Sequence, residues 1–272
     1  MAATTTGETR TAGAGERLPL TAGRRAALVI GVPVCLLLVA ALGLDLVAIF
    51  GQGTFPVRYT APAAARSLTV STPGGQVLVN GATRGQAEVT GTARYSLVRS
   101  KVTAGSGAGA AAVRYQCVFP VGDCEFDPTV TAPAGVRVTV STGGGSVGLI
   151  GTAGPVTLST GGGDIIASAT SGPLSLNSSG GDITAGATRS AAVTVTTGGG
   201  DVYLTFTRVP RDVRVDTSGG NITINLPASP AGYHVTTHTN GGNVTDAVQQ
   251  EDSSPNVVTA ITGGGDIDIR QQ

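Results

Sequence analysis

A short turn rich in glycine recurs along most of this 272-residue chain and constrains its fold more than any other feature. Each copy has a Thr or Ser, then at least two glycines, then a polar residue and an Ile or Val. Seven copies lie at residues 141–147, 159–165, 178–183, 196–202, 217–222, 239–244 and 262–267, and a degenerate eighth lies near residues 71–77. The polar residues after the glycines stand at 146, 164, 182, 201, 221, 243 and 266, so successive copies are 18, 18, 19, 20, 22 and 23 residues apart. Such a period is typical of repeat architectures, in which each copy is one structural unit.

Short segments of alternating apolar and polar residues flank these turns. Val136–Val140 precedes a turn and Val202–Phe206 follows one, and a corner with Pro or Gly, such as Gly154–Pro155, restarts the cycle. Alternation with a period of two indicates β-strands that have one buried face. Outside one N-terminal apolar run, no stretch has helical periodicity. The sequence therefore predicts an all-β domain.

Two all-β architectures fit a cycle of strand, glycine turn, strand and corner. In a β-solenoid each cycle is one coil, and identical turns stack so closely that a glycine such as Gly144 leaves no room for a Cβ. In an antiparallel meander or sandwich the glycines close hairpin loops instead. The regular spacing and the low aromatic content, 4% of residues, favour the thin core of a solenoid.

Composition excludes some classes of function. The formal net charge is zero and no basic run interleaves with aromatic residues, so nucleic acid is not an expected partner. Apolar residues make up 40% of the chain, which is too many for a disordered chain.

The N-terminal part predicts a membrane anchor. Residues 26–44 contain no charge and are long enough to cross a bilayer as a helix. Arg24 and Arg25 precede this run and Asp45 follows it, so the positive-inside rule predicts a cytoplasmic N-terminus and an extracytoplasmic C-terminus. A cleaved signal peptide is the alternative. We thus expect a cytoplasmic tail at 1–24, a transmembrane helix at 25–50, a linker at 51–65 and a β-repeat domain at 66–272, interrupted by a cysteine-bearing insertion around 95–133.

The cysteines agree with an extracytoplasmic domain. Cys117 and Cys124 bracket a segment with Pro and Gly-Asp that predicts a tight loop, and an oxidising compartment favours a disulfide between them. A zinc site is the alternative, although no second cysteine pair or nearby histidine completes a tetrahedral set. Cys35 lies in the apolar run and is expected to act as a small hydrophobic residue.

The polar residues after the glycines should stack along one edge of a solenoid. We expect them to stabilise the turns by hydrogen bonds to nearby backbone amides, and calcium binding by stacked carboxylates is the alternative. These predicted turn residues are Asp164, Asp182, Asp201, Asn221, Asn243 and Asp266. A second set of hydroxyl residues should form a flat, solvated face that could also bind polysaccharide or ice, namely Thr139, Thr157, Ser175 and Thr194 with Ser141, Ser159, Asn177 and Thr196.

Evidence for catalysis is slight. Arg189, Arg208, Arg211 and Arg214 could serve a polysaccharide lyase, but no column of acidic partners accompanies them. His234 and His238 lie in one late strand, far from any nucleophile motif, and are expected at the surface. No catalytic, metal or cofactor residue is predicted.

In these repeats the chain resembles the bacterial "putative adhesin" families of uncharacterised function, whose domains carry tandem Gly-Gly-Asp-Ile/Val units. The resemblance covers residues 60–272 and is strongest from residue 136 onward. It implies a right-handed β-helical or solenoid fold and brings no catalytic residues with it. The loop from Cys117 to Cys124 is not part of the repeat and gets no support from the resemblance.

Together these features predict a non-enzymatic, single-pass protein of the cell envelope. Its β-solenoid would make an adhesive or structural contact, with a cell-surface glycan or another envelope protein as partner. An extracytoplasmic enzyme acting on polysaccharide and an envelope sensor are the alternatives.

Overall fold

The computed structural model describes residues 31–40, 43, 52–96, 98–118 and 124–272. The chain divides into two units, Met1–Val47 and Ala48–Gln272. In the first unit, residues 31–40 are helical, whereas the predicted tail at 1–24 and most of the predicted membrane span lie outside the described residues. Among the residues that are described, no helix combines the length and the apolar character needed to cross a membrane.

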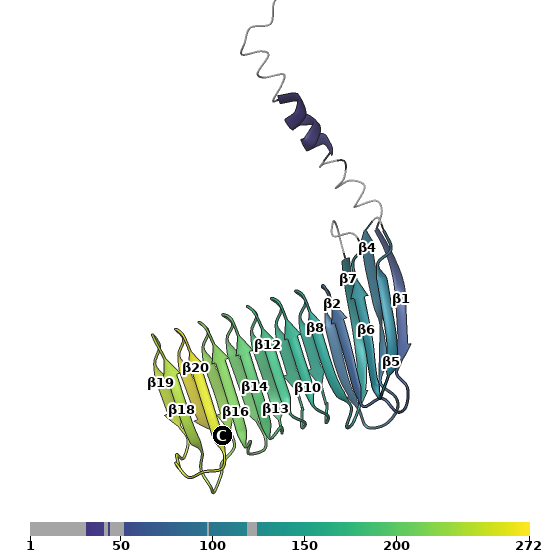
Figure 1. Cartoon of the computed structure of the whole chain (residues 1–272). Coiled ribbons are helices and arrows are strands. Elements are labelled where there is room, and N and C mark those ends of the chain that lie inside the picture. Colours follow the sequence, from purple (N-terminus) through teal and green to yellow (C-terminus); the bar gives the residue numbers. More distant parts are fainter. Residues whose placement is uncertain (1–30, 41–42, 44–51, 97, 119–123) are drawn as a thin grey trace, which may run out of the picture. The chain divides into compact units, whose positions relative to one another are not determined.

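The second unit contains two β-sheets, and from residue 124 onward consecutive strands alternate between them (Figure 1). Sheet A has eleven strands, in the spatial order β1 (Gln52–Thr60), β4 (Glu88–Ser96), β7 (Cys124–Pro133), β3 (Val77–Ala82), β9 (Val147–Ile150), β11 (Ile165–Ser168), β13 (Ile183–Thr188), β15 (Val202–Phe206), β17 (Ile222–Leu226), β21 (Ile267–Gln271) and β19 (Val244–Ala247). Sheet B has ten, in the order β18 (His234–Thr239), β20 (Val257–Thr262), β16 (Asp212–Thr217), β14 (Ala192–Thr197), β12 (Leu174–Ser178), β10 (Val156–Thr160), β8 (Arg137–Thr142), β2 (Ser67–Thr72), β6 (Ala110–Gln116) and β5 (Lys101–Gly107).

Each coil places one strand in sheet B, turns at the glycines and places the next strand in sheet A. Equivalent strands of neighbouring coils pair in parallel and in register, as Leu158 does with Val140 on one side and Leu176 on the other. The all-β class and the solenoid predicted from the repeat spacing are thereby confirmed. The hairpin alternative does not describe the repeats, because the two strands around a glycine turn lie in different sheets.

The core lies between the sheets and consists mainly of Val, Leu, Ile and Ala side chains. Alternate residues of each strand point inward and are buried, as in β10, where Val156 and Leu158 are buried and Thr157 is exposed. A fully buried Leu, Ile or Val contributes about 1.5–3 kcal/mol relative to exposure, so the stack is stabilised by many moderate contributions. The largest buried side chains, Tyr115, Phe126, Phe206 and Tyr233, include three that lie outside the regular coils or at their ends.

The N-terminal end departs from the parallel pattern. Strands β1 and β4 pair antiparallel with each other, β4 pairs antiparallel with β7, and β5 pairs antiparallel with β6. Residues 51–65, expected to be a linker, therefore contain an edge strand that pairs with β4 along its whole length. Residues 95–133, expected to be an insertion, supply β5, β6 and β7 to the two sheets. The alternation of apolar and polar residues does not identify β5 as a strand, because Gly, Ala and Ser make up most of it and nearly all of its residues are exposed.

Coil order in space differs from coil order in the sequence at both ends. The coil β2/β3 lies between β6/β7 and β8/β9, although it comes first in the chain. The last coil, β20/β21, lies between β16/β17 and β18/β19. Each end of the solenoid is thus closed by a coil that is not the terminal one in sequence.

Candidate functional site

The residues after the glycines form a hydrogen-bonded column at the edge of the stack where each coil enters sheet A. The carboxylate Oδ1 of Asp164 accepts from the backbone N–H of Asp182 at 2.9 Å, and Oδ1 of Asp182 accepts from that of Asp201 at 2.8 Å. Asp201 in turn accepts from the backbone N–H of Asn221 at 2.7 Å. The predicted bonds to backbone amides are present, but each amide belongs to the next coil, so the side chains connect coils.

The same column follows the exchanged coil order at the C-terminal end. Oδ1 of Asn221 accepts from the backbone N–H of Asp266 at 2.9 Å, and Oδ1 of Asp266 accepts from that of Asn243 at 2.7 Å. Asp266 therefore stands between Asn221 and Asn243. These six residues, from Asp164 to Asn243, are called the Asp/Asn column below.

A second column lies beneath the first and is buried. Oγ1 of Thr160 donates to the carbonyl of Gly145 in the preceding coil at 2.8 Å and accepts from the N–H of Gly163 in its own turn at 3.1 Å. The same pair of bonds recurs at Ser178, Thr197, Thr217, Thr262 and Thr239. These hydroxyls satisfy backbone groups that a glycine corner would otherwise bury unpaired.

The glycines do not all share one role, and the expectation for Gly144 was wrong. A Cβ at Gly144 would meet nothing within 4 Å, whereas a Cβ at Gly145 would lie 1.7 Å from the carbonyl oxygen of Gly75. The equivalent distance is 2.3 Å from Gly163 to the oxygen of Gly145, and 2.2 Å from Gly181 to that of Gly163. Close approach between coils thus restricts the last glycine of each turn, because its Cβ would point at the neighbouring backbone. In turns with three glycines the first is restricted as well, since a Cβ at Gly161 would lie 2.1 Å from the carbonyl oxygen of Gly143, while the middle glycine faces open space.

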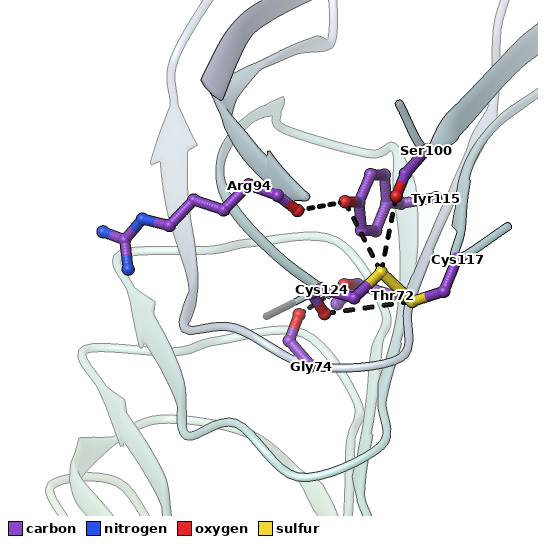
Figure 2. Close-up of a disulfide and its surroundings, with 7 residues drawn as sticks. All are labelled: Thr72, Gly74, Arg94, Ser100, Tyr115, Cys117 and Cys124. Carbon is purple, nitrogen blue, oxygen red and sulfur yellow. Dashed lines mark hydrogen bonds between the residues drawn. A yellow bond between two sulfur atoms is a disulfide. The ribbon is translucent and has the colours of Figure 1, made fainter. Parts of the chain in front are cut away.

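Cys117 and Cys124 form a disulfide with a Cα–Cα distance of 6.0 Å at the N-terminal end of the domain (Figure 2). Cys124 Sγ lies 3.5 Å from Ser100 Oγ and 3.6 Å from Tyr115 Oη. Tyr115 Oη donates to the carbonyl of Arg94 at 2.5 Å, and its ring packs on Phe126 with a centroid distance of 5.6 Å. The disulfide is therefore part of a packed corner between β4, β6 and β7.

Burial raises the pKa of the Tyr115 hydroxyl, and its hydrogen bond with Ser100 opposes part of that shift. A cavity of about 470 Å³ lies beside this corner, lined by Ser71, Thr72, Pro73, Arg114, Tyr115, Gln116 and Cys117. Arg114 is the charged side chain on its wall, with no carboxylate in the lining to act as its acid or base partner.

The arginines weighed for catalysis lie at corners and on a strand of successive coils, and the bond from the N–H of Thr207 to the carbonyl of Thr188 places the segments with Arg208 and Arg189 side by side. Within the described part of the chain, Arg189, Arg208, Arg211 and Arg214 make no ion pair with a carboxylate. His238 bonds Asn240 at 3.1 Å on the outermost coil, whereas His234 is half-buried with an Nδ1 that lacks a hydrogen-bond partner. Among the described residues, no group of three His, Cys, Asp or Glu side chains could hold a metal ion.

The outer face of sheet B carries the predicted hydroxyl rows in register. Thr157 pairs with Thr139 and Ser175, and Ser175 pairs with Thr194. The adjacent row contains Ser141, Ser159, Asn177 and Thr196. The first row continues from Thr194 into Arg214 on β16 and the second from Thr196 into Asp216, where the uncharged surface ends.

Sequence reasoning missed a second feature, on the outer face of sheet A. Tyr203 on β15 is 46% exposed, and its hydroxyl oxygen accepts from Asn225 Nδ2 on β17 at 3.0 Å. Alternation along Val202–Phe206 gave Tyr203 an outward position, but the pairing of β15 with β17 was needed to place Asn225 beside it.

A known family matches nearly the whole β-sheet domain. The model of the Toastrack DUF4097 family matches residues 61–270, which is most of the chain. The chain belongs to this family. The resemblance to adhesin-type domains is thus confirmed at the level of the Toastrack family, and no match among curated proteins was found.

Solved structures also resemble this Toastrack domain. A "putative adhesin" from Bacteroides fragilis is 13% identical, with 81% of this chain and 97% of that chain covered and a TM-score of 0.49. A "putative lipid binding protein" from Parabacteroides distasonis is 12% identical, with 80% and 96% covered and a TM-score of 0.45. A "putative cell adhesion protein" from Clostridium sporogenes is 12% identical, with 81% and 100% covered and a TM-score of 0.37. At these identities the likenesses assign no ligand to this chain.

Proposed function

We propose that this Toastrack protein is a non-enzymatic protein of the cell envelope whose β-solenoid binds an extended partner at the cell surface. The partner would be a cell-surface glycan or another envelope protein. One observation carries the proposal: both sheets present outer faces on which equivalent side chains of successive coils lie in register, as Thr139, Thr157 and Ser175 do.

A surface of this kind suits a polymer better than a small molecule. Neighbouring parallel strands are spaced by about 4.8 Å, so equivalent side chains repeat at that interval along the stack. A chain molecule that lies along the stack could repeat one weak contact at several coils, and multiple weak contacts add to a high overall affinity. Enzymes, by contrast, usually enclose their substrate in a concave pocket with a few converging polar groups.

The proposed location rests on the N-terminal sequence. The uncharged run at 26–44 would form a single transmembrane helix, with Arg24 and Arg25 on the cytoplasmic side and the Toastrack domain outside. The disulfide between Cys117 and Cys124 supports an extracytoplasmic domain, because reduced thiols are the rule in the cytoplasm.

Location and binding can be tested separately. For location, intact cells that express the full chain with a C-terminal epitope are treated with protease. We expect loss of the epitope with retention of an N-terminal tag, and protection of both tags would contradict the proposed topology.

For binding, the full chain purified in mild detergent is incubated with envelope fragments of the host and sedimented. We expect the chain to sediment with the fragments. A chain that stays in the supernatant at every protein concentration would contradict a binding function. As a control, the disulfide is reduced and alkylated, which shows whether binding depends on the packed corner between β4, β6 and β7.

A further inference from the structure

Tyr203 is an exposed aromatic side chain on the outer face of sheet A, with Thr184 and Thr223 on either side of it. Further along the same row, Ile166 and Leu78 are exposed aliphatic residues. In register, Tyr203 lies between Thr184 on β13 and Thr223 on β17, and Thr205 pairs with Asn225. We call Tyr203, Thr205, Thr223 and Asn225 the Tyr203 patch.

The ring of Tyr203 is held in position by its neighbours. Asn225 Nδ2 bonds the Tyr203 hydroxyl at 3.0 Å and Thr205 Oγ1 at 3.4 Å. Asn225 lies one pair of residues further along the neighbouring strand, so this bond directs the ring across the sheet from β15 toward β17. A ring fixed before binding loses less conformational entropy when a ligand stacks on it.

The backbone beside the ring is also irregular. The pairing of β13 with β15 shifts register between Ala185 and Thr188, and Ala187 has a φ of 49°. Gly186 lies in this bulge, and a Cβ there would meet nothing within 4 Å. Bulges redirect side chains and interrupt pairing, and they are frequent beside binding sites. Here the bulge begins directly after Ala185, one residue beyond Thr184, the register partner of Tyr203.

The charges around the Tyr203 patch favour a neutral ligand over an anionic one. Asp268 and Arg270 on β21 form an ion pair through two contacts and neutralise each other. The exposed carboxylates of Asp182, Asp201 and Asp266 stand at the starts of β13, β15 and β21, along one side of the patch. A polyanion would be repelled by this row, whereas a neutral polymer would not.

We infer that the Tyr203 patch binds a neutral polysaccharide built of hexopyranose units. An aromatic ring offers a flat apolar surface to the C–H face of a pyranose ring, and the amide and hydroxyl groups of Asn225, Thr205 and Thr223 can bond the sugar hydroxyls. The carbonyl oxygen Oδ1 of Asn225 remains available as an acceptor, since its Nδ2 makes the bonds to Tyr203 and Thr205. This inference rests on the proposed binding function and names both its ligand class and its face.

The test uses the full chain in detergent and affinity electrophoresis in gels that contain a soluble β-1,4-glucan, β-1,3-glucan or mannan, with polygalacturonate as the anionic polymer. We expect the chain to be retarded by at least one neutral polymer and not by polygalacturonate. Tyr203→Ala should weaken that interaction by about tenfold or more, as expected for loss of a stacked aromatic contact. Tyr203→Phe keeps the ring and should weaken it by no more than about threefold.

A matched control lies in a glycine turn, outside the outer faces of both sheets. Gly162→Ala adds a methyl group into open space and should leave retardation unchanged, and circular dichroism checks that each variant is folded. Retardation by a neutral polymer that survives Tyr203→Ala would overturn the inference. So would a chain that sediments with envelope fragments yet ignores all neutral polymers, an outcome that leaves the proposed binding function intact.

Discussion

Strands β8 to β17 pair only in parallel, whereas β1, β4 and β5 at the N-terminal end run antiparallel to their neighbours. In the parallel region each coil repeats the same buried hydroxyl and the same last glycine, so backbone spacing holds the coils together. The antiparallel region has no such repetition. It depends on single contacts, the Tyr115–Phe126 pair and the Cys117–Cys124 disulfide among them.

The two regions differ because regular stacking and protection of an exposed sheet edge place different requirements on the sequence. A repeating stack needs a spacing that every coil can adopt, which only small or hydrogen-bonded groups at the turn allow. An end of the stack must instead protect an open edge, and edge strands commonly do so with Pro, charge or irregularity. Pro56 lies in the edge strand β1, and Lys101 begins the edge strand β5.

The strongest way to break the parallel region is to fill the space between two coils. Gly163→Ala places a Cβ 2.3 Å from the carbonyl oxygen of Gly145, and this backbone contact has to shift. We expect a loss of about 3 kcal/mol in the free energy of unfolding, at the upper end of ordinary overpacking. Urea denaturation of the purified chain measures it.

The adjacent glycine provides the control for that substitution. A Cβ at Gly162 meets nothing within 4 Å, so Gly162→Ala should change stability by less than about 0.5 kcal/mol. Equal losses for the two variants would show that backbone spacing between coils is not what restricts the last glycine.

Removing the disulfide should destabilise the antiparallel region and leave the parallel region unaffected. Replacing Cys117 and Cys124 by Ser opens a loop of sequence separation 7, and the chain-entropy model gives a loss of about 2.5 kcal/mol. We expect hydrogen exchange to accelerate in β4, β6 and β7, which meet at the corner, and to stay unchanged in β10 to β15. If hydrogen exchange accelerated equally in both regions, the parallel and antiparallel regions would not be independent in stability.

A smaller effect is expected from one buried hydroxyl of the parallel region. Thr160 is 2% exposed, and Thr160→Val removes its bonds to the carbonyl of Gly145 and the N–H of Gly163. Loss of a buried partner costs about 1–3 kcal/mol, so we expect a destabilisation near 2 kcal/mol. Thr157→Val, on the exposed face of the same strand, is the reference, and thermal unfolding of the two variants should differ accordingly.

The smallest effect is a dependence on alkaline pH at the C-terminal end. Burial raises the pKa of Tyr233 to about 12, and its hydroxyl donates to the carbonyl of Pro227 at 2.6 Å. An unfolded tyrosine ionises near pH 10, so between pH 10 and 12 the native state holds the proton that the unfolded state has lost. The stabilisation is complete below pH 10 and falls as pH rises, at no more than about 1.4 kcal/mol per pH unit.

Tyr233→Phe isolates this contribution. The variant lacks the ionising group, so its stability should fall less steeply than that of the original chain between pH 10 and 12. Denaturant titrations at pH 9, 10 and 11 compare the slopes, and identical slopes would contradict a role for Tyr233.

Much of the parallel region could be predicted from the sequence because its constraints are local. The alternation in segments such as Val193–Thr196 gives the buried face, and the spacing of the glycines gives the coil. The sequence does not distinguish Gly144 from its neighbours, because three identical residues conceal that the first and the last face the adjacent coil and the middle one does not.

The antiparallel region and the coil order could not be read in the same way. Alternation in Gln52–Thr60 is the same for parallel, antiparallel and unpaired segments, so β1 was taken for a linker. The bond from the N–H of Asp266 to Asn221 spans 45 residues. Nothing in the repeat sequences indicates that the coil with Asp266 lies next to the coil with Asn221. Tyr203 and Asn225 likewise become neighbours only through the pairing of β15 with β17.

The exchanged coil order at the C-terminal end sets the sequence of events in which the domain is made. Because β20/β21 occupies the gap between β16/β17 and β18/β19, residues 257–271 are synthesised after β18 and β19 yet lie further inside the stack. A growing chain that emerges N-terminus first must hold β18/β19 away from β16/β17 until those residues arrive. A product that stops before residue 257 would retain the sequences of β18 and β19 but lack the strands on which they rest. This end of the stack can therefore take its final arrangement only after residues 257–271 have been made.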